Sequence, residues 1–280
     1  MDFLREDVKN EEGQVEVQAE QVYEGINNIE KLQARCYQLL EDFNIKYSSK
    51  KMNLVLFDDA MCHLIRISRI IKQPRSSALL VGVGGSGKQS LTRLAADIGR
   101  NIIRQLVLTK SFGEKDLKEE IKEYLELTGH GGKPLTFIMT DAEIKKEEFL
   151  EYINMLLSTG EIPGLIAKDE KEAWLGDITQ DYCKNNNVTE PSAIQLYGYF
   201  MDRVRDNLHI VLCFSPVGQK FRERARKFPA LFNECCIDWF LPWPEEALVS
   251  VAETFIKNFK ELDTKPETKI ELYKHMGSVH

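Results

Sequence analysis

The sequence predicts an α/β fold with a parallel sheet, and two patterns carry that prediction. Short apolar runs alternate with segments of helical periodicity along most of the 280 residues. The runs are mostly apolar, without a polar residue at every second position, which is typical of strands buried on both faces. We therefore expect a parallel sheet that is covered by helices on both sides.

The expected elements follow in chain order. Residues 14–46 have apolar side chains close to every 3.6 positions and are predicted to be helical, and a second helix is expected over 53–71. Residues 169–192 are the least regular part, in which residues 185–187 and Pro191 indicate a loop, and this part could be an insertion within the sheet domain. The predicted strands are 78–81, 102–108, 135–139, 208–214 and 235–240. The later helices are expected at 89–98, 114–127, 145–157, 193–205, 219–227, 245–259 and 267–275.

Composition and charge exclude several classes of protein. The chain is 43% hydrophobic and 29% charged, and no apolar run approaches the roughly 20 residues that cross a bilayer. Its six cysteines include no C-x-x-C pair, so we expect reduced thiols rather than a disulfide framework or a zinc site. Residues 1–30 hold nine acids and two bases, which accounts for the whole net charge of −7. Because the body is neutral, we expect neither nucleic acid nor a membrane as a partner.

These patterns predict three parts. Residues 1–46 are expected to be an acidic helical arm, 47–241 a large α/β domain, and 242–280 a partial helical lid subdomain. The arm is expected to be solvated, with a partner-binding tail as the alternative.

A glycine-rich loop lies between the first predicted strand and its helix. Its G-x-x-x-x-G-K pattern is typical of a phosphate-binding loop, in which backbone N–H groups and the lysine contact phosphates. The alternative is a tight turn with a surface lysine. The residues predicted to bind a nucleotide here are Gly82, Gly84, Gly85, Ser86, Gly87, Lys88, Gln89 and Ser90.

The loop departs from its pattern at one position. A Ser or Thr normally follows the lysine and supplies a hydroxyl to Mg²⁺. Here that residue is Gln89, and the hydroxyl comes one position later at Ser90. An amide oxygen is a weaker ligand, so nucleotide binding is favoured over efficient hydrolysis.

A second acidic motif follows the strand predicted at 135–139. Asp141 is either the residue that holds Mg²⁺, or it occupies the position of the catalytic base while Thr140 takes the metal position. In either register one of the two usual carboxylates is absent, and Glu143 lies one step away. A strand-ending Asp that caps a helix is the alternative. The predicted metal ligands are therefore Ser90 and Asp141.

Two further features are candidates for catalysis. Ser215 ends the strand predicted at 208–214, where it could sense a γ-phosphate; a turn-forming Ser is the alternative. Arg224 and Arg226 belong to a basic run that is either an arginine finger for a neighbouring module or a solvated helix face.

Several segments in combination resemble the fourth AAA+ module of axonemal dynein heavy chains. The resemblance runs from about residue 28 to the end, and axonemal members share the glutamine at position 89. The matching segments are 52–57, 81–95, 137–142, 204–209, 213–218, 225–230, 237–240 and 243–248.

The resemblance implies a three-layer P-loop AAA+ domain with N-terminal helices and a truncated helical lid. It implies ATP or ADP with Mg²⁺, adenine near Leu54, Val55 and Leu56, and Arg224 and Arg226 facing the preceding module's site. The family is a minus-end-directed microtubule motor with six modules in a ring. The expected partners are neighbouring modules and other dynein chains, with only indirect contact to the microtubule because these residues include no stalk. The expected location is the cytoplasm, at the cytoskeleton of the ciliary axoneme.

We therefore expect an ATP-binding regulatory module with weak or no independent hydrolysis. One alternative is a vestigial P-loop module with a structural or interaction role in the ring. A P-loop kinase or phosphotransferase is a third possibility, but it requires an acceptor site and lid arginines that the sequence does not show.

Overall fold

The structure, a computed structural model, describes residues 2–6, 8–10, 15–258 and 265–279. It divides into two compact units. One runs from Arg66 to Leu241, and the other combines the residues before Arg66 with those after Leu241. The first boundary therefore lies inside helix α2, which spans Asp58–Lys72.

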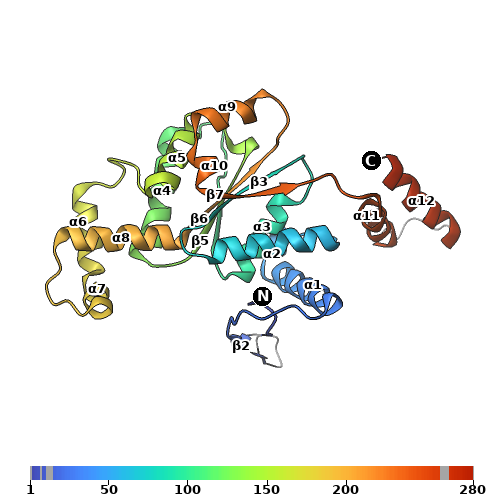
Figure 1. The fold of residues 1–280 in the computed structure, drawn as a ribbon, viewed down its shortest axis with the longest axis horizontal. Coiled ribbons are helices and arrows are strands. Elements are labelled where there is room, and N and C mark those ends of the chain that lie inside the picture. The colour runs from blue at the N-terminus through green and yellow to red at the C-terminus, as the bar shows by residue number, and fades with distance from the viewer. Residues whose placement is uncertain (1, 7, 11–14, 259–264, 280) are drawn as a thin grey trace. The chain divides into compact units, whose positions relative to one another are not determined.

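The larger unit is built on a five-stranded sheet, which confirms the predicted α/β class (Figure 1). All of its strand pairs are parallel, and their order is β4-β5-β6-β3-β7. Every residue of β3, β5 and β6 is buried, as their largely apolar composition predicts. The strands are β3 Ser77–Gly82, β4 Ile102–Gln105, β5 Leu135–Thr140, β6 Leu208–Phe214 and β7 Cys235–Phe240.

Helices cover both faces of this sheet, as expected for three layers. The connection from β3 to β4 crosses the sheet in one direction, and every later connection runs back. Right-handed crossovers therefore place α3 on one face and the later helices on the other. Figure 1 shows α3 on one side of the strands and α4, α5 and α9 on the opposite side. Their bounds are α3 Lys88–Ile98, α4 Glu114–Leu125, α5 Phe149–Thr159 and α9 Gln219–Lys227.

The segment 169–192, predicted to be the least regular part of the chain, is largely helical, and the loop predicted near residues 185–191 is confined to residues 187–192. The segment contains α6 (Lys168–Asp177) and α7 (Thr179–Asn186), and α8 (Ala193–Asn207) follows. Trp174 of α6 stacks on the ring of His130, with centroids 6.2 Å apart, and on Phe200 at 5.9 Å. These distant partners, rather than a local apolar period, stabilise α6. The other short elements of this unit are a π turn at Glu126–His130, a 3₁₀ turn at Asp141–Glu143 and α10 at Ala230–Asn233.

The N-terminal segment is not one long helix, so the prediction over 14–46 is wrong in its first part. Strand β1 (Val8–Lys9) pairs with β2 (Val15–Val17) in antiparallel fashion, and α1 spans only Ile29–Lys46. Asn28 sets the start of α1, because its side-chain oxygen accepts a hydrogen bond from the Lys31 N–H at 2.9 Å. Residue 14 lies outside the described residues.

Helix α1 holds the chain that follows it in an extended form. Asn44 exchanges two hydrogen bonds with the backbone of Met52, at 2.9 and 2.7 Å. Gln33 donates to the Leu56 carbonyl at 3.0 Å, and the Leu56 N–H donates to the hydroxyl of Tyr37 at 3.1 Å. These bonds occupy the backbone that a helix from residue 53 would use. The second helix therefore begins at Asp58, after a 3₁₀ turn at Ser48–Lys50.

Two C-terminal helices pack on each other in the same unit. They are α11 (Glu245–Asn258) and α12 (Pro266–Val279), and residue 259 of the predicted helix lies outside the described residues. Ala252, Ile256 and Tyr273 form their shared apolar core. None of the helices in the described ranges is both long and apolar enough to cross a membrane.

Candidate functional site

The candidate site lies at the carboxyl edge of the parallel sheet. Strand β3 lies between β6 and β7, so the chain leaves β3 toward one side of the sheet and returns to the other side at β7. Ligands of open α/β sheets bind outside the carboxyl ends of the strands at such a switch point. This topology brings the loop after β3 to the same edge as the residues that follow β5 and β6.

The glycines of the loop have separate roles. Gly85 and Gly87 have φ values of 78° and 86°, in the left-handed region that favours glycine. Gly82 is required for a different reason, because a Cβ at this position would lie 2.6 Å from the Cβ of Phe240 on β7. The first glycine therefore permits close strand packing, and the later two permit the turn into α3.

Lys88 is folded into the loop. Its ammonium group donates to the carbonyls of Gly82 and Val83 at 2.7 and 2.8 Å and to the hydroxyl of Ser86 at 2.9 Å. Burial lowers the pKa of Lys88 below its usual value, while Cys213 and Asp141 oppose that shift. The loop therefore holds the Lys88 ammonium group in place. Phosphate oxygens could accept its hydrogen bonds instead of the loop oxygens that accept them here.

The start of α3 adds to this anion site. The N-cap is Gly87, which provides no side chain to the first turn. The first N–H groups of a helix have no intrahelical acceptors, and the helix dipole is positive there. Gln89 and Ser90 lie in this first turn and are half-buried. The loop and helix together can cradle phosphate oxygens.

Asp141, Ser215 and Arg224 meet at the same edge of the sheet. The Ser215 N–H donates to Asp141 Oδ2 at 2.7 Å, and Arg224 Nη1 donates to Oδ1 at 2.5 Å. The Ser215 hydroxyl accepts from the Val217 N–H at 3.4 Å, which is the turn that its sequence context offered as an alternative. The structure thus joins three predicted residues through the carboxylate of Asp141.

Arg224 is buried against its own chain rather than exposed on α9. It is only 4% exposed and also binds Glu147, with Nε and Nη2 donating at 3.2 and 3.0 Å. Burial acts to lower its pKa, but the hydrogen bonds to Glu147 and Asp141 outweigh it and leave the pKa raised. In this structure the guanidinium is held by two carboxylates of its own chain, and a role of Arg224 toward a neighbouring module stays a prediction. Arg226 is exposed and makes no ion pair with the described residues.

The sequence did not assign a role to Glu143, which the structure places close to Gln89. Its Oε2 accepts from the Thr140 N–H at 2.7 Å, and its Oε1 accepts from Gln105 Nε2 at 2.5 Å. Gln105 also donates to the Gln89 side-chain oxygen at 3.4 Å, and its own oxygen accepts from Arg93. Burial raises the pKa of Glu143, against these hydrogen bonds. The available signal was Gln105, which with Arg104 interrupts the apolar residues of the strand predicted at 102–108.

The residues predicted to ligate Mg²⁺ do not fit that role as they are placed. Both carboxylate oxygens of Asp141 accept hydrogen bonds, and the adjacent Arg224 charge opposes a cation. The oxygen of Gln89 accepts from Gln105. Within the described residues no group of three or more His, Cys, Asp or Glu could hold a metal ion. Ser90 alone remains of the predicted ligands.

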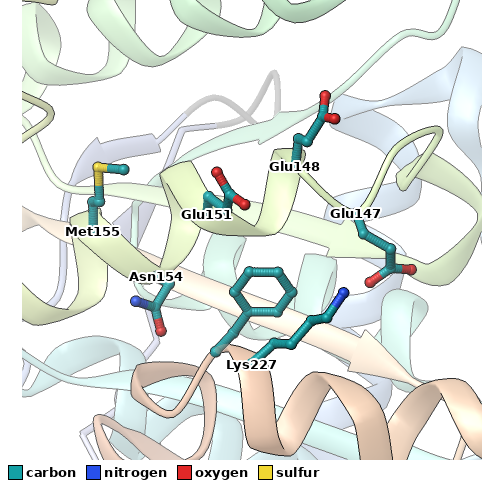
Figure 2. A pocket seen from close by; sticks show the side chains of 7 residues that line it. Glu147, Glu148, Glu151, Asn154, Met155 and Lys227 are labelled. Atoms are coloured by element: carbon teal, nitrogen blue, oxygen red, sulfur yellow. The ribbon is translucent and has the colours of Figure 1, made fainter.

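A surface cavity of about 560 Å³ lies beside Glu147, away from the loop residues (Figure 2). Figure 2 shows three carboxylates around it and Lys227 extending along its other side. Its negative charge does not suit a phosphate, so we place the candidate nucleotide site at the glycine loop. The cavity is lined by Glu147, Glu148, Glu151, Asn154, Met155, Lys227 and Phe228.

The residues expected near adenine belong to the other unit. Leu54 and Val55 are half-buried and Leu56 is fully buried, in the extended segment that α1 holds. Their role in base binding stays a prediction.

A family model and individual related proteins identify the same family. The family described as "P-loop containing dynein motor region D4" matches residues 52–280. The chain is 49% identical over 282 aligned residues to dynein axonemal heavy chain 5 of Rattus norvegicus and 43% identical to dynein axonemal heavy chain 8 of Homo sapiens over 283. It is 45% identical over 249 residues to the dynein gamma chain of the flagellar outer arm of Chlamydomonas reinhardtii. The matches cover 99%, 100% and 89% of this chain but only 8%, 6% and 5% of those relatives.

Proposed function

The chain belongs to the dynein heavy chain family, and on that premise we propose that it is an ATP- or ADP-binding AAA+ module of a ciliary or flagellar motor. The observation that carries this proposal is the Lys88 ammonium held against the glycine loop, beside a helix start that has no side-chain cap. Residues 82–90 are proposed to bind the phosphates.

The module is proposed to be regulatory, with slow hydrolysis. Efficient turnover requires a carboxylate that is free to orient or deprotonate the attacking water. Asp141 is instead hydrogen bonded to Arg224 and to the Ser215 N–H. We therefore expect the chain alone to hydrolyse ATP well below the roughly 1–10³ s⁻¹ of typical enzymes.

The proposed partners are neighbouring AAA+ modules of a ring and other dynein chains, at the cytoskeleton of the axoneme. The identity to axonemal and flagellar relatives supports this location. Contact with the microtubule is proposed to be indirect. A purely structural module with a vestigial loop is the second candidate, supported by the position of Arg224 on Asp141.

Calorimetric titration of ATP and ADP tests the proposal against that alternative. We expect the folded chain to bind at one site and Lys88→Ala to weaken binding by about 1.5–3 kcal/mol, because a charge-assisted phosphate contact is lost. Lys133→Ala is the matched control, since exposed Lys133 precedes β5 and lies at the opposite edge of the sheet. If the folded wild-type chain binds neither ATP nor ADP, the proposal is wrong and the structural module with a vestigial loop is the better account.

A further inference from the structure

We propose that the phosphate loop of this chain binds its nucleotide without a requirement for Mg²⁺, because Gln89 directs N–H donors rather than an oxygen toward the phosphates. This inference rests on the proposed nucleotide binding and specifies whether that binding depends on Mg²⁺. Gln89 occupies the position at which the G-x-x-x-x-G-K pattern otherwise supplies a hydroxyl to the metal.

The orientation of Gln105 follows from its charged neighbours. A guanidinium can only donate hydrogen bonds, so the atom of Gln105 that faces Arg93 is the oxygen. The nitrogen of Gln105 then faces Glu143, whose carboxylate accepts at 2.5 Å. Arg93 and Glu143 therefore both require the same orientation of the Gln105 side-chain amide.

The orientation of Gln89 follows in turn. The second hydrogen of Gln105 Nε2 is directed at the side chain of Gln89, at 3.4 Å. An amide NH₂ group has no acceptor capacity, so the atom of Gln89 that receives this bond is its oxygen. Its nitrogen donates to no acceptor among the described residues and is available to a phosphate oxygen in the first turn of α3.

No other predicted ligand replaces the missing oxygen. Asp141 has both carboxylate oxygens engaged, and Arg224 adds a positive charge beside it. Lys88 and the N–H groups of α3 already supply positive charge to a phosphate chain. A divalent cation that accompanies the nucleotide should therefore add little to the binding affinity.

The test is calorimetric titration of the full chain with ADP, once in EDTA and once in excess Mg²⁺. We expect the two dissociation constants to agree within about threefold, well short of the tenfold step that corresponds to 1.4 kcal/mol. Gln89→Thr restores the hydroxyl, and for this variant we expect Mg²⁺ to tighten binding by about tenfold or more. Gln89→Ala is the control that removes the donor without adding a ligand, and it should bind more weakly in both buffers.

Each result has a distinct reading. Wild-type binding that is about tenfold or more tighter in Mg²⁺ would overturn the inference while the proposed nucleotide binding stands. A Gln89→Thr variant that binds equally in both buffers would show that Gln89 does not set the cation requirement. If folded wild-type chain, verified by circular dichroism, binds ADP in neither buffer, the proposed function fails together with the inference.

Discussion

The guanidinium of Arg224 lies on the carboxylate of Asp141, with Nη1 donating to Oδ1 at 2.5 Å. The two residues are 83 positions apart, and the contact joins the basic run of α9 to the end of β5. Arg224 also lies over the ring of Phe214, with its Cζ 5.1 Å from the ring centroid. The arginine is thus part of the sheet edge rather than of the exposed surface of α9.

Arg224→Ala is expected to lower the free energy of unfolding by about 2 kcal/mol, because it leaves two carboxylates without their cation. This loss of unfolding free energy is smaller than that for fully buried ion pairs, because the side chains of Asp141 and Glu147 are 40% and 42% exposed. Arg226→Ala, the exposed neighbour on the same helix, should change the free energy by about 0.5 kcal/mol or less. Urea denaturation of the two variants measures the difference, and equal values would contradict the buried role of Arg224.

Arg226 is the exposed candidate for an arginine that acts on the preceding module. In a complete ring, Arg226→Ala is expected to lower ATP turnover at that module's site by about 10³-fold or more. Lys227→Ala removes an adjacent exposed charge and serves as the matched control. If turnover is unchanged in Arg226→Ala, the basic run is a solvated helix face.

Glu143 should make stability depend on pH in a defined direction. Burial raises its folded-state pKa above the usual 4.5, so the folded chain holds this proton more tightly than the unfolded chain does. The contribution is fully present below pH 4.5 and is lost as the pH rises through the raised pKa. The unfolding free energy of Glu143→Gln relative to wild type should therefore increase as the pH rises through that window.

Chemical denaturation of both proteins from pH 4 to 7 checks this dependence, with Glu148→Gln as the control for an exposed glutamate near the same edge. A difference between wild type and Glu143→Gln that stays constant across the window, or that moves in the opposite direction, would contradict the buried position of this carboxylate.

Gly82→Ala is expected to destabilise the chain even without nucleotide. The added Cβ would meet the Cβ of Phe240 at 2.6 Å and its backbone oxygen at 2.9 Å, so β3 and β7 would have to separate. We expect a loss of about 1–3 kcal/mol, as for other overpacked positions. Gly84→Ala is the control, because nothing lies within 4 Å of its added Cβ. Equal unfolding midpoints for the two variants would show that this strand contact is not tight.

The sequence by itself determined the sheet and the position of the loop. The strands and the helices that follow them carry local signals, namely apolar runs and a 3.6-residue period, and these predicted β3, β5, β6 and β7 to within about two residues. The glycine pattern at 82–88 is also local, since it encodes a turn and a helix start. Local signals suffice wherever a segment's structure depends mainly on its own residues.

Only the tertiary structure decided where the polar side chains point. Trp174 of α6 packs on His130 and Phe200, whose separation from it along the chain no local period encodes. Arg224 is turned inward because it binds Asp141 and Glu147, which lie between β5 and α5. Gln89 is oriented by Gln105 and, through it, by Glu143 and Arg93. Hydrogen bonds are directional and short, so the role of each side chain depends on partners that folding alone brings within reach.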